Sequence, residues 1–234
     1  MYKRQILNSY NESSPWSNSI TTPIVHKIAG IENMDAYIEH LNLFMVDDST
    51  KIERFSEILS SKYGSTPPRL LVFIGSMSLI FREEIQSLWG KVPTIVCGAD
   101  PYVYHEKFYR QRDTVTPEEK THMSELAEEF NFTYMHTPIY LEENVQLMCR
   151  MIPGMKKLIF LGDGIYPNPE YDKQLRELIK DKYPQMDYEY ISSRTNSLHQ
   201  LYNAVRKTDK TTGILVSTWF TESFTSSNFL INAY

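Results

Sequence analysis

Leu70-Leu-Val-Phe-Ile-Gly-Ser76 is a short apolar run that ends in a glycine and a serine. The same pattern returns at Lys157-Leu-Ile-Phe-Leu-Gly-Asp-Gly164. Between such runs lie segments in which apolar residues recur with helical spacing. This alternation predicts an α/β fold in which parallel sheets are covered by helices.

The rest of the chain shows the same alternation of apolar runs and helical segments. Further strands are predicted at residues 5–9, 36–44, 94–97, 132–135, 188–191 and 213–217. Helical stripes are predicted at residues 50–59, 77–88, 141–152, 171–179 and 196–205. Pro23 predicts a kink or a restart in a helix between Trp16 and Ile28. The order of elements predicts two Rossmann-like lobes, at residues 1–136 and 137–218, followed by a crossover or tail at 219–234.

Composition excludes several classes of protein. The 234 residues include 24 Lys or Arg and 29 Asp or Glu, which give a formal charge of −5. A strongly basic surface for nucleic acid is not expected, because phosphate binding needs clustered cations. An apolar content of 41% argues against intrinsic disorder. No apolar run approaches the roughly 18 residues that span a bilayer, and no signal-peptide pattern opens the sequence.

Small or polar residues follow most of the predicted strands. They are Asn8-Ser9, Gly75-Ser76, Gly98-Ala99-Asp100, Gly162-Asp163-Gly164, Ser192-Ser193 and Ser217-Thr218. In open α/β sheets, the carboxyl ends of the strands form the crevice in which ligands bind. A ligand-binding site is therefore expected at these positions.

The opening phrase Ile6-Leu-Asn-Ser-Tyr-Asn-Glu-Ser-Ser-Pro-Trp-Ser17 resembles the start of the periplasmic sensor domains of bacterial hybrid two-component histidine kinases. Those domains are similar to the substrate-binding proteins of ABC transporters and have the periplasmic-binding-protein type 1 fold. Further matches follow in the expected order, so the likeness covers nearly the whole chain. They are Phe73–Ser76, Pro93–Asp100, Tyr140–Leu147, Pro153–Gly164 and Gly213–Phe220.

This resemblance implies a function. It implies an extracytoplasmic domain that binds a small molecule between two lobes and signals by lobe closure, in a membrane-anchored parent that pairs as a homodimer. The leader and anchor are expected to lie outside this sequence, and no cofactor is expected. The lobes are expected to join near residues 135–140 and 217–221. Proteins of this fold cross between lobes three times, so after the strand at 213–217 the final return segment is expected either to lie outside this sequence or to be replaced by the tail in a reduced form.

In the first lobe, the expected ligand-binding residues follow the predicted strands or lie in the loops beyond them. They are Asn8, Ser9, Tyr10, Glu12, Trp16, Ser76, Asp100 and Tyr102. Short polar side chains can hydrogen-bond a ligand, and an indole offers a flat stacking face. The structural alternative is that Asn8, Ser9 and Ser13 cap the following helix while Trp16 fills the core.

In the second lobe, the expected binding residues are Asp163, Ser193, Arg194 and Trp219. Arg194 would clamp a ligand that carries a carboxylate, because a guanidinium matches a carboxylate with two hydrogen bonds. The structural alternatives are that Asp163 caps the next helix and that Arg194 pairs with a surface carboxylate.

Three alternative functions remain open: a free solute-binding protein of an ABC transporter, a small α/β enzyme, and an interaction domain that docks a partner through the aromatic segment Tyr102–Tyr109. No catalytic residue is predicted, because there is no G-x-S-x-G elbow and no Walker-type loop. No metal site is predicted either, because the six histidines form no H-E-x-x-H motif. Cys97 and Cys149 are expected to be buried hydrophobes, and a disulfide between them stays open.

Overall fold

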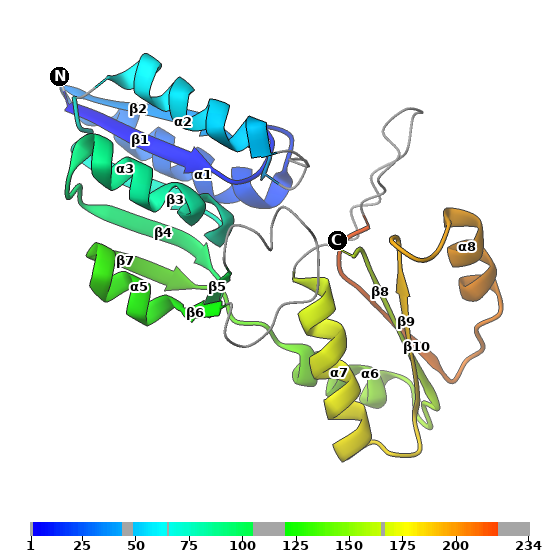
Figure 1. Cartoon of the computed structure of the whole chain (residues 1–234). Helices are drawn as coiled ribbons and strands as arrows, with labels where there is room; N and C mark the ends of the chain where they lie inside the picture. The colour runs from blue at the N-terminus through cyan, green and yellow to red at the C-terminus, as the bar shows by residue number, and fades with distance from the viewer. Residues whose placement is uncertain (1, 44–48, 65, 105–119, 165–166, 220–234) are drawn as a thin grey trace. The chain divides into compact units, whose positions relative to one another are not determined.

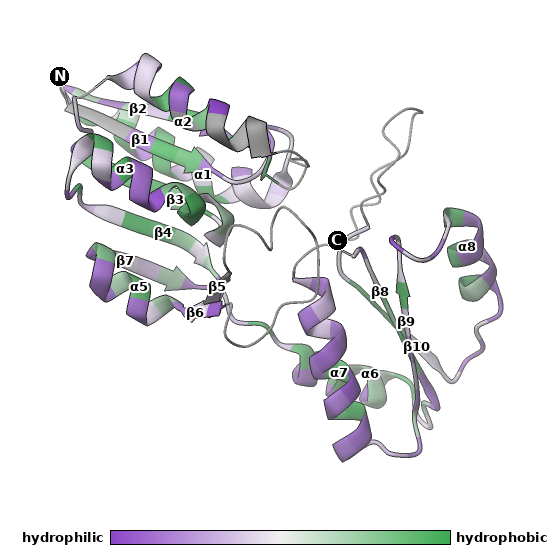
Figure 2. Ribbon diagram, viewed as in Figure 1, coloured by the Kyte–Doolittle hydropathy of each residue, from purple (hydrophilic) through white to green (hydrophobic). Residues whose placement is uncertain are grey.

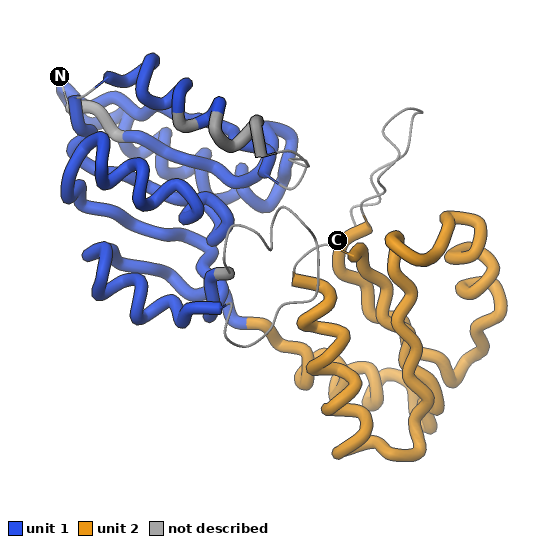
Figure 3. The backbone as a smooth tube through the Cα atoms, in the orientation of Figure 1, with its two compact units in different colours: residues 1–138 blue, residues 139–234 orange. Residues whose placement is uncertain are grey.

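The computed structural model describes residues 2–43, 49–64, 66–104, 120–164 and 167–219. The chain divides into two compact units, Met1–Pro138 and Ile139–Tyr234, which are called unit 1 and unit 2 below (Figure 3). The sequence predicted a boundary between residues 136 and 137. Residues 220–234 of the predicted tail at 219–234, and most of the aromatic segment 102–109, lie outside the described residues.

Unit 1 is built on a five-stranded sheet with the order β2-β1-β3-β4-β7, in which all neighbours are parallel (Figure 1). The strands are β1 (Tyr2–Asn8), β2 (Met34–His40), β3 (Leu70–Ile74), β4 (Thr94–Ala99) and β7 (Phe132–His136). The central strand of the sheet is β3, and its Val72 pairs with the fully buried Ile6 of β1. The predicted parallel sheet is therefore present.

Helices cover both faces of this sheet. They are α1 (Pro15–Ala29), α2 (Ser49–Tyr63), the 3-10 helix η2 (Ser76–Phe81), α3 (Arg82–Trp89) and α5 (Met123–Phe130). A separate antiparallel pair joins β5 (Tyr102–Tyr104) to β6 (Lys120–His122). The helix α1 runs without interruption through Pro23, although the sequence predicted a kink or restart there. Its apolar face is held against the sheet on both sides of Pro23, and tertiary packing offsets the lost hydrogen bond.

The alternation of strand side chains sorts the core of unit 1 into two layers. Val72 and Ile74 point toward α1, where Ile20 and Ile24 pack against them. Neighbouring residues on β3 point to the opposite face of the sheet, which carries α3. In Figure 2, β1 and β4 carry hydrophobic stretches, whereas α3 and α5 alternate between hydrophobic and hydrophilic residues.

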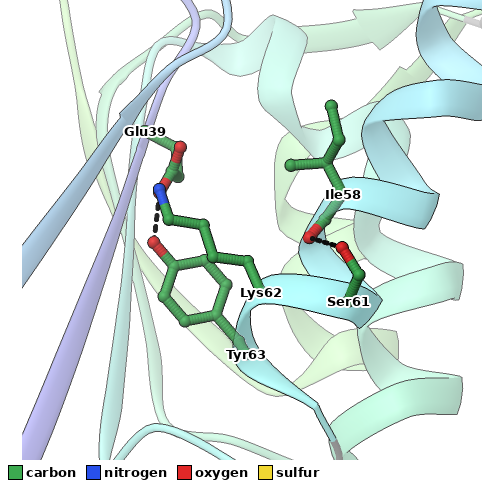
Figure 4. Close-up of polar contacts among 5 residues, drawn as sticks. All are labelled: Glu39, Ile58, Ser61, Lys62 and Tyr63. Atoms are coloured by element: carbon green, nitrogen blue, oxygen red, sulfur yellow. Dashed lines mark hydrogen bonds and ion pairs between the residues drawn. The ribbon is translucent and has the colours of Figure 1, made fainter.

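The carboxyl end of α2 is held to the edge strand β2 by polar contacts (Figure 4). Both Lys62 and Tyr63 donate to Oε1 of Glu39 on β2. The ring of Tyr63 also makes an edge contact with Trp89, with ring centroids 6.4 Å apart. Burial, then the hydrogen bond to Glu39, raises the pKa of Tyr63. This cluster explains how a helix at the edge of the sheet keeps its position.

Unit 2 contains a three-stranded parallel sheet with the order β10-β8-β9. The strands are β8 (Lys157–Gly162), β9 (Asp187–Ser192) and β10 (Thr212–Val216), and the helices are α6 (Leu141–Met151), α7 (Asn168–Lys182) and α8 (Leu198–Arg206). On one face Phe160 packs with residues of α6 and α7. On the other face Ile159 and Leu161 pack with Leu201 of α8.

The prediction of an α/β fold with two parallel sheets is confirmed. Cys97 and Cys149 are both free thiols, and burial raises the pKa of Cys97. None of the helices in the described part of the chain has the length and apolar character that a membrane span requires.

Candidate functional site

In both sheets, the connections on the two sides of the first strand run in opposite directions across the sheet. In unit 1 the first strand, β1, lies between the second and the third, and in unit 2 the first strand, β8, lies between β9 and β10. An open α/β sheet with this order has its crevice beyond the carboxyl ends of the first and third strands, where the connections diverge. Topology therefore assigns one candidate site to each unit, at β1/β3 in unit 1 and at β8/β10 in unit 2.

At the end of β1, Asn8 and Ser9 are fully buried and use their polar atoms within the protein. The Nδ2 of Asn8 donates to Oγ of Ser17 at 3.2 Å, and its Oδ1 accepts from the backbone N–H of Tyr10 at 3.0 Å. The Oγ of Ser9 accepts from the N–H of Ser78 at 2.9 Å and donates to the carbonyl of Gly75 at 3.3 Å. These side chains fix the loop after β1 against the turn after β3.

Ser76 and Asp100 join the ends of β3 and β4. The Oγ of Ser76 donates to Oδ2 of Asp100 at 3.1 Å and accepts from the Asp100 N–H at 2.8 Å. Ser76 is buried, whereas Asp100 is half-buried. Burial raises the pKa of Asp100, while the hydrogen bond from Ser76 and the nearby His136 oppose this rise. The second carboxylate oxygen, Oδ1, makes no hydrogen bond to the described residues.

Two aromatic rings lie on glycines at the carboxyl ends of β3 and β4. A Cβ at Gly75 would stand 2.9 Å from the ring of Tyr10, and a Cβ at Gly98 would stand 2.3 Å from the indole of Trp16. Both glycines have positive φ, at 82° and 69°. The two rings contact each other at a centroid distance of 5.0 Å and a tilt of 57°. Burial, then the charge of Asp100, raises the pKa of Tyr10.

The unit-1 edge is defined as Tyr10, Trp16, Gly75, Ser76, Gly98 and Asp100. Within it, the indole of Trp16 is 40% exposed, whereas Asp100 is half-buried. The alternative in which Trp16 fills the core is therefore wrong. Side-chain capping is absent too, because α1 begins after Ser14 with no side-chain cap hydrogen bond.

The structure does not bring two of the predicted binding residues of unit 1, Glu12 and Tyr102, into the unit-1 edge. The side chain of Glu12 is exposed. The ring of Tyr102 contacts His122 at 5.3 Å, and Nζ of Lys120 lies 4.5 Å from its centroid. Tyr102 thus packs on the neighbouring strand β6.

Replacing Asp100 with asparagine is expected to stabilise the protein more at pH 7.5 than at pH 3.5, which lies below the unfolded-state pKa of about 3.9. The folded-state pKa of Asp100 lies above the unfolded value of about 3.9, so the unfolded state loses this proton first as pH rises. Ionisation of Asp100 therefore lowers the free energy of unfolding as pH rises through the folded-state pKa. Thermal unfolding at both pH values, with Asp35→Asn as a control in the same unit, measures the effect. An equal shift at both pH values would contradict this assignment.

In unit 2, hydrogen bonds among Asp163, Asn168 and the exposed residue Thr218 connect the carboxyl ends of β8 and β10. The Nδ2 of Asn168 donates to Oδ1 of Asp163 at 2.7 Å and to Oγ1 of Thr218 at 2.9 Å. Thr218 donates in turn to Oδ2 of Asp163 at 2.7 Å. Asp163 is 1% exposed and Asn168 is fully buried. The unit-2 edge is defined as Asp163, Asn168, Thr218 and Trp219.

Asp163 does not cap α7, whose N-cap residue is Pro167 and has no side-chain cap hydrogen bond. Its backbone carbonyl accepts from the hydroxyl of Tyr190 at 2.5 Å. Burial, opposed by a hydrogen bond with Ser192 and reinforced by the charges of Asp163 and Asp172, raises the pKa of Tyr190 to about 12. Asp163 therefore lies at the centre of a network: its carboxylate contacts Asn168 of α7 and Thr218 after β10, and its backbone carbonyl contacts Tyr190 of β9.

The other predicted binding residues of unit 2 differ in their exposure to solvent. Trp219 is 7% exposed and packs with Ile159 and Leu201 in the core under α8. Arg194 is exposed, and its aliphatic chain lies against Gly164, where a Cβ would stand 2.6 Å from it. Ser193 is half-buried, and its N–H donates to the carbonyl of Gly162 at 3.1 Å.

Two buried polar atoms of the unit-2 edge have no hydrogen-bond partner among the described residues. They are Oδ1 of Asn168, an acceptor, and Nε1 of Trp219, a donor. Leaving such groups unpaired costs about 1–3 kcal/mol each, so native proteins rarely do so without a water or ligand nearby. The unit-2 edge thus offers one donor and one acceptor to a polar molecule.

Sequence reasoning missed Asn168 and the packing role of Gly98. Asn168 opens a helix after a loop, a position that carries no signal of a contact with Asp163. Gly98 was visible as part of a strand end, but its contact with Trp16 depends on the path of the loop after β1. In the described ranges, no group of His, Cys, Asp and Glu side chains is arranged to hold a metal ion.

Comparison with solved structures identifies similar folds. A substrate-binding protein with adhesive properties from Clostridium difficile, in its ligand-free open form, matches with a TM-score of 0.51 and 11% identity, over 88% of this chain and 61% of that chain. A periplasmic binding protein/LacI transcriptional regulator from Alkaliphilus metalliredigens, complexed with D-xylulofuranose, has a TM-score of 0.47 and 10% identity, over 92% of this chain and 67% of that chain.

This chain therefore spans about three fifths of the length of the Clostridium difficile protein. No family model and no curated protein sequence matches the chain. At this level of identity the likeness shows the fold. The chain has an α/β fold with parallel sheets that is similar to the periplasmic-binding-protein type 1 fold, as the sequence predicted.

Proposed function

We propose that this chain is the extracytoplasmic ligand-sensing domain of a two-component histidine kinase. In this proposal a small molecule contacts the unit-1 edge and the unit-2 edge, and the resulting change in the angle between the units regulates a membrane-anchored, dimeric parent. The observation that carries the binding function is that polar side chains and an exposed indole gather at the topological switch points of the sheets.

The ligand chemistry follows from the groups at the two edges. The unit-1 edge has an indole that is 40% exposed and the half-buried carboxylate of Asp100, and the unit-2 edge has a buried acceptor and a buried donor that lack partners among the described residues. A carboxylate accepts hydrogen bonds and repels anions. The expected ligand is a small polar molecule that carries hydroxyl or amine donors and a flat apolar face.

A thermal-shift screen of sugars, amino acids and nucleosides tests this function. A ligand at 100 times its Kd adds about 2.7 kcal/mol to the free energy of unfolding. Trp16→Ala is expected to weaken the binding of any hit at least tenfold, because stacking on the indole is lost. Tyr202→Ala, which removes an exposed aromatic residue on α8, is the control and is expected to bind normally. Equal affinity in both variants would refute the assignment of the unit-1 edge.

The sensor role rests on the resemblance of the sequence to kinase sensor domains. A ligand that prefers the closed arrangement 100-fold supplies about 2.7 kcal/mol for closure, which is enough to change the activity of a coupled kinase. In the full-length parent, the ligand is expected to change the rate of autophosphorylation, and Trp16→Ala is expected to remove the response. A parent with no kinase core would favour the alternative, a solute-binding protein of an ABC transporter.

A further inference from the structure

One side of α6 carries apolar side chains that do not belong to the core of unit 2. Leu147 and Met151 are 47% and 72% exposed, and Tyr140, which immediately precedes the helix, is 55% exposed. Their spacing places all three along one side of the helix. Val145, on the inner side, is fully buried with the core residues of α7 and β8. Tyr140, Leu147 and Met151 are called the α6 stripe below.

The α6 stripe is continuous enough to suit a partner. Single exposed apolar residues are common on protein surfaces, whereas large apolar side chains lined up on one helix side mark an interaction surface. The remaining residue on this side is Asn144, which is also exposed. Its Nδ2 donates to the carbonyl of Tyr140 at 2.6 Å, so its amide is already used in part at the start of the helix.

The charges beside the α6 stripe indicate which partner fits. The first turn of α6 contains Glu142 and Glu143, and its last turn contains Arg150. Glu142 forms an ion pair with Lys182 of α7. The exposed side chains of Glu143 and Arg150 form no ion pair with the described residues. Two helical turns, or about 10 Å, separate them, and both lie on the same flank of the stripe.

A second copy of this chain is complementary to both charges at once. When two copies of a helix pack antiparallel about a twofold axis, residues equally far from the axis on its two sides face one another. With the axis next to Leu147, Glu143 of each copy faces Arg150 of the other. The two Leu147 side chains meet at the axis, and Met151 reaches the ring of Tyr140 in the other copy, which is a favourable sulfur–aromatic contact. A parallel pair would instead bring like charges together.

We propose that unit 2 forms a symmetric dimer through antiparallel contact between the α6 stripes of two copies. This inference deepens the proposed function, on which it rests, by naming the face through which the dimeric parent pairs. The contact uses no residue of the unit-1 edge or the unit-2 edge. One helix from each copy buries less than the roughly 1,200 Å² of a stable interface, so a Kd on the order of 100 μM is expected. In the proposed membrane-anchored parent, a high effective concentration makes such a contact sufficient.

Sedimentation equilibrium of the chain without ligand, from roughly 10 to 500 μM, tests the proposal. The wild-type chain is expected to pass from monomer to dimer over this range, so it is monomeric at the low micromolar concentrations of spectroscopic unfolding. Leu147→Glu is expected to weaken the dimer at least tenfold, because two carboxylates would meet at the axis. Leu198→Glu makes the same change at a leucine of α8 that is 41% exposed, and it is expected to leave association unchanged.

A charge exchange tests the antiparallel orientation. Glu143→Arg and Arg150→Glu are each expected to weaken the dimer several-fold, because each change places like charges opposite one another twice. The double variant restores both pairs and is expected to associate like the wild type. The proposal is overturned if the wild-type chain stays monomeric throughout, if the two Leu→Glu variants associate equally, or if the double variant is no tighter than the single ones. Such a failure would reject the α6 contact and leave ligand binding at the two edges standing.

Discussion

Replacement of Asp163 with alanine is expected to lower the free energy of unfolding of unit 2 by about 3 kcal/mol. Asp163 is 1% exposed, and its two carboxylate oxygens accept from Asn168 and Thr218 at 2.7 Å. Alanine would leave the buried amide of Asn168 without its charged acceptor and would also remove the acceptor of the Thr218 hydroxyl. Such hydrogen bonds to a charged group contribute about 1.5–3 kcal/mol each, and the loss is large because water cannot easily replace the carboxylate.

Urea denaturation followed by far-UV circular dichroism measures this effect. Asp163→Asn is expected to lose about half as much, because the amide keeps one acceptor oxygen and the hydroxyl of Thr218 can rotate to accept from its NH₂ group. Glu143→Ala, which removes an exposed carboxylate from α6, is the control and is expected to change stability by less than about 0.5 kcal/mol. A loss below about 1 kcal/mol for Asp163→Ala would show that the network does not hold β8 to β10.

Replacement of Gly98 with alanine is expected to displace Trp16 and to weaken ligand binding at least tenfold. A Cβ at this position would stand 2.3 Å and 2.7 Å from two atoms of the indole, closer than any van der Waals contact. The backbone φ of 69° adds a cost of about 1–2 kcal/mol for any side chain. Since the carbonyl and Cα of Gly98 belong to a strand of the central sheet, the indole is the group that must move.

The backbone cost can be separated from the clash. Gly64→Ala also places a side chain at positive φ, 60°, but nothing lies within 4 Å of the new Cβ, so only the backbone cost is expected there. In a Trp16→Ala background, Gly98→Ala is expected to cost no more than Gly64→Ala, because the group that clashes has been removed. A cost that stays the same with and without Trp16 would show that the indole does not lie on Gly98.

The sequence predicted the sheets well because the strand signal is local. A run such as Lys157–Gly162 is apolar enough to be buried on both faces, and the glycine at its end marks where the strand stops. The same local pattern predicted that Asn8, Ser76, Asp100 and Asp163 lie at the carboxyl ends of strands. The continuous helix through Pro23 and the short strands β5 and β6 were not predicted, because tertiary contacts decide them.

The roles of the site residues were harder to predict than their positions. Ser9 and Asp163 are polar residues at strand ends, yet their hydrogen bonds are made inside the protein. Trp16 and Trp219 were both expected to face a ligand, but the first is 40% exposed and the second is 7% exposed. Whether an indole faces solvent or the core depends on which helix packs over it, and local sequence does not carry that information.

The chain has three tryptophans, and they lie at three useful places. Trp16 belongs to the unit-1 edge and Trp219 to the unit-2 edge. Trp89 lies at the end of α3, where its Nε1 donates to the carbonyl of Gly64 at 2.9 Å. A ¹H–¹⁵N spectrum of the indole groups therefore reports on both candidate edges and on an internal control.

The central claim is that one small molecule contacts both edges. The most direct measurement is the titration of a ligand from the thermal-shift screen into ¹⁵N-labelled protein while the three indole signals are followed. We expect the signals of Trp16 and Trp219 to shift together with a single Kd, while that of Trp89 stays in place. A stabilising ligand that leaves Trp16 and Trp219 unmoved, or that moves them with two different affinities, would contradict the account.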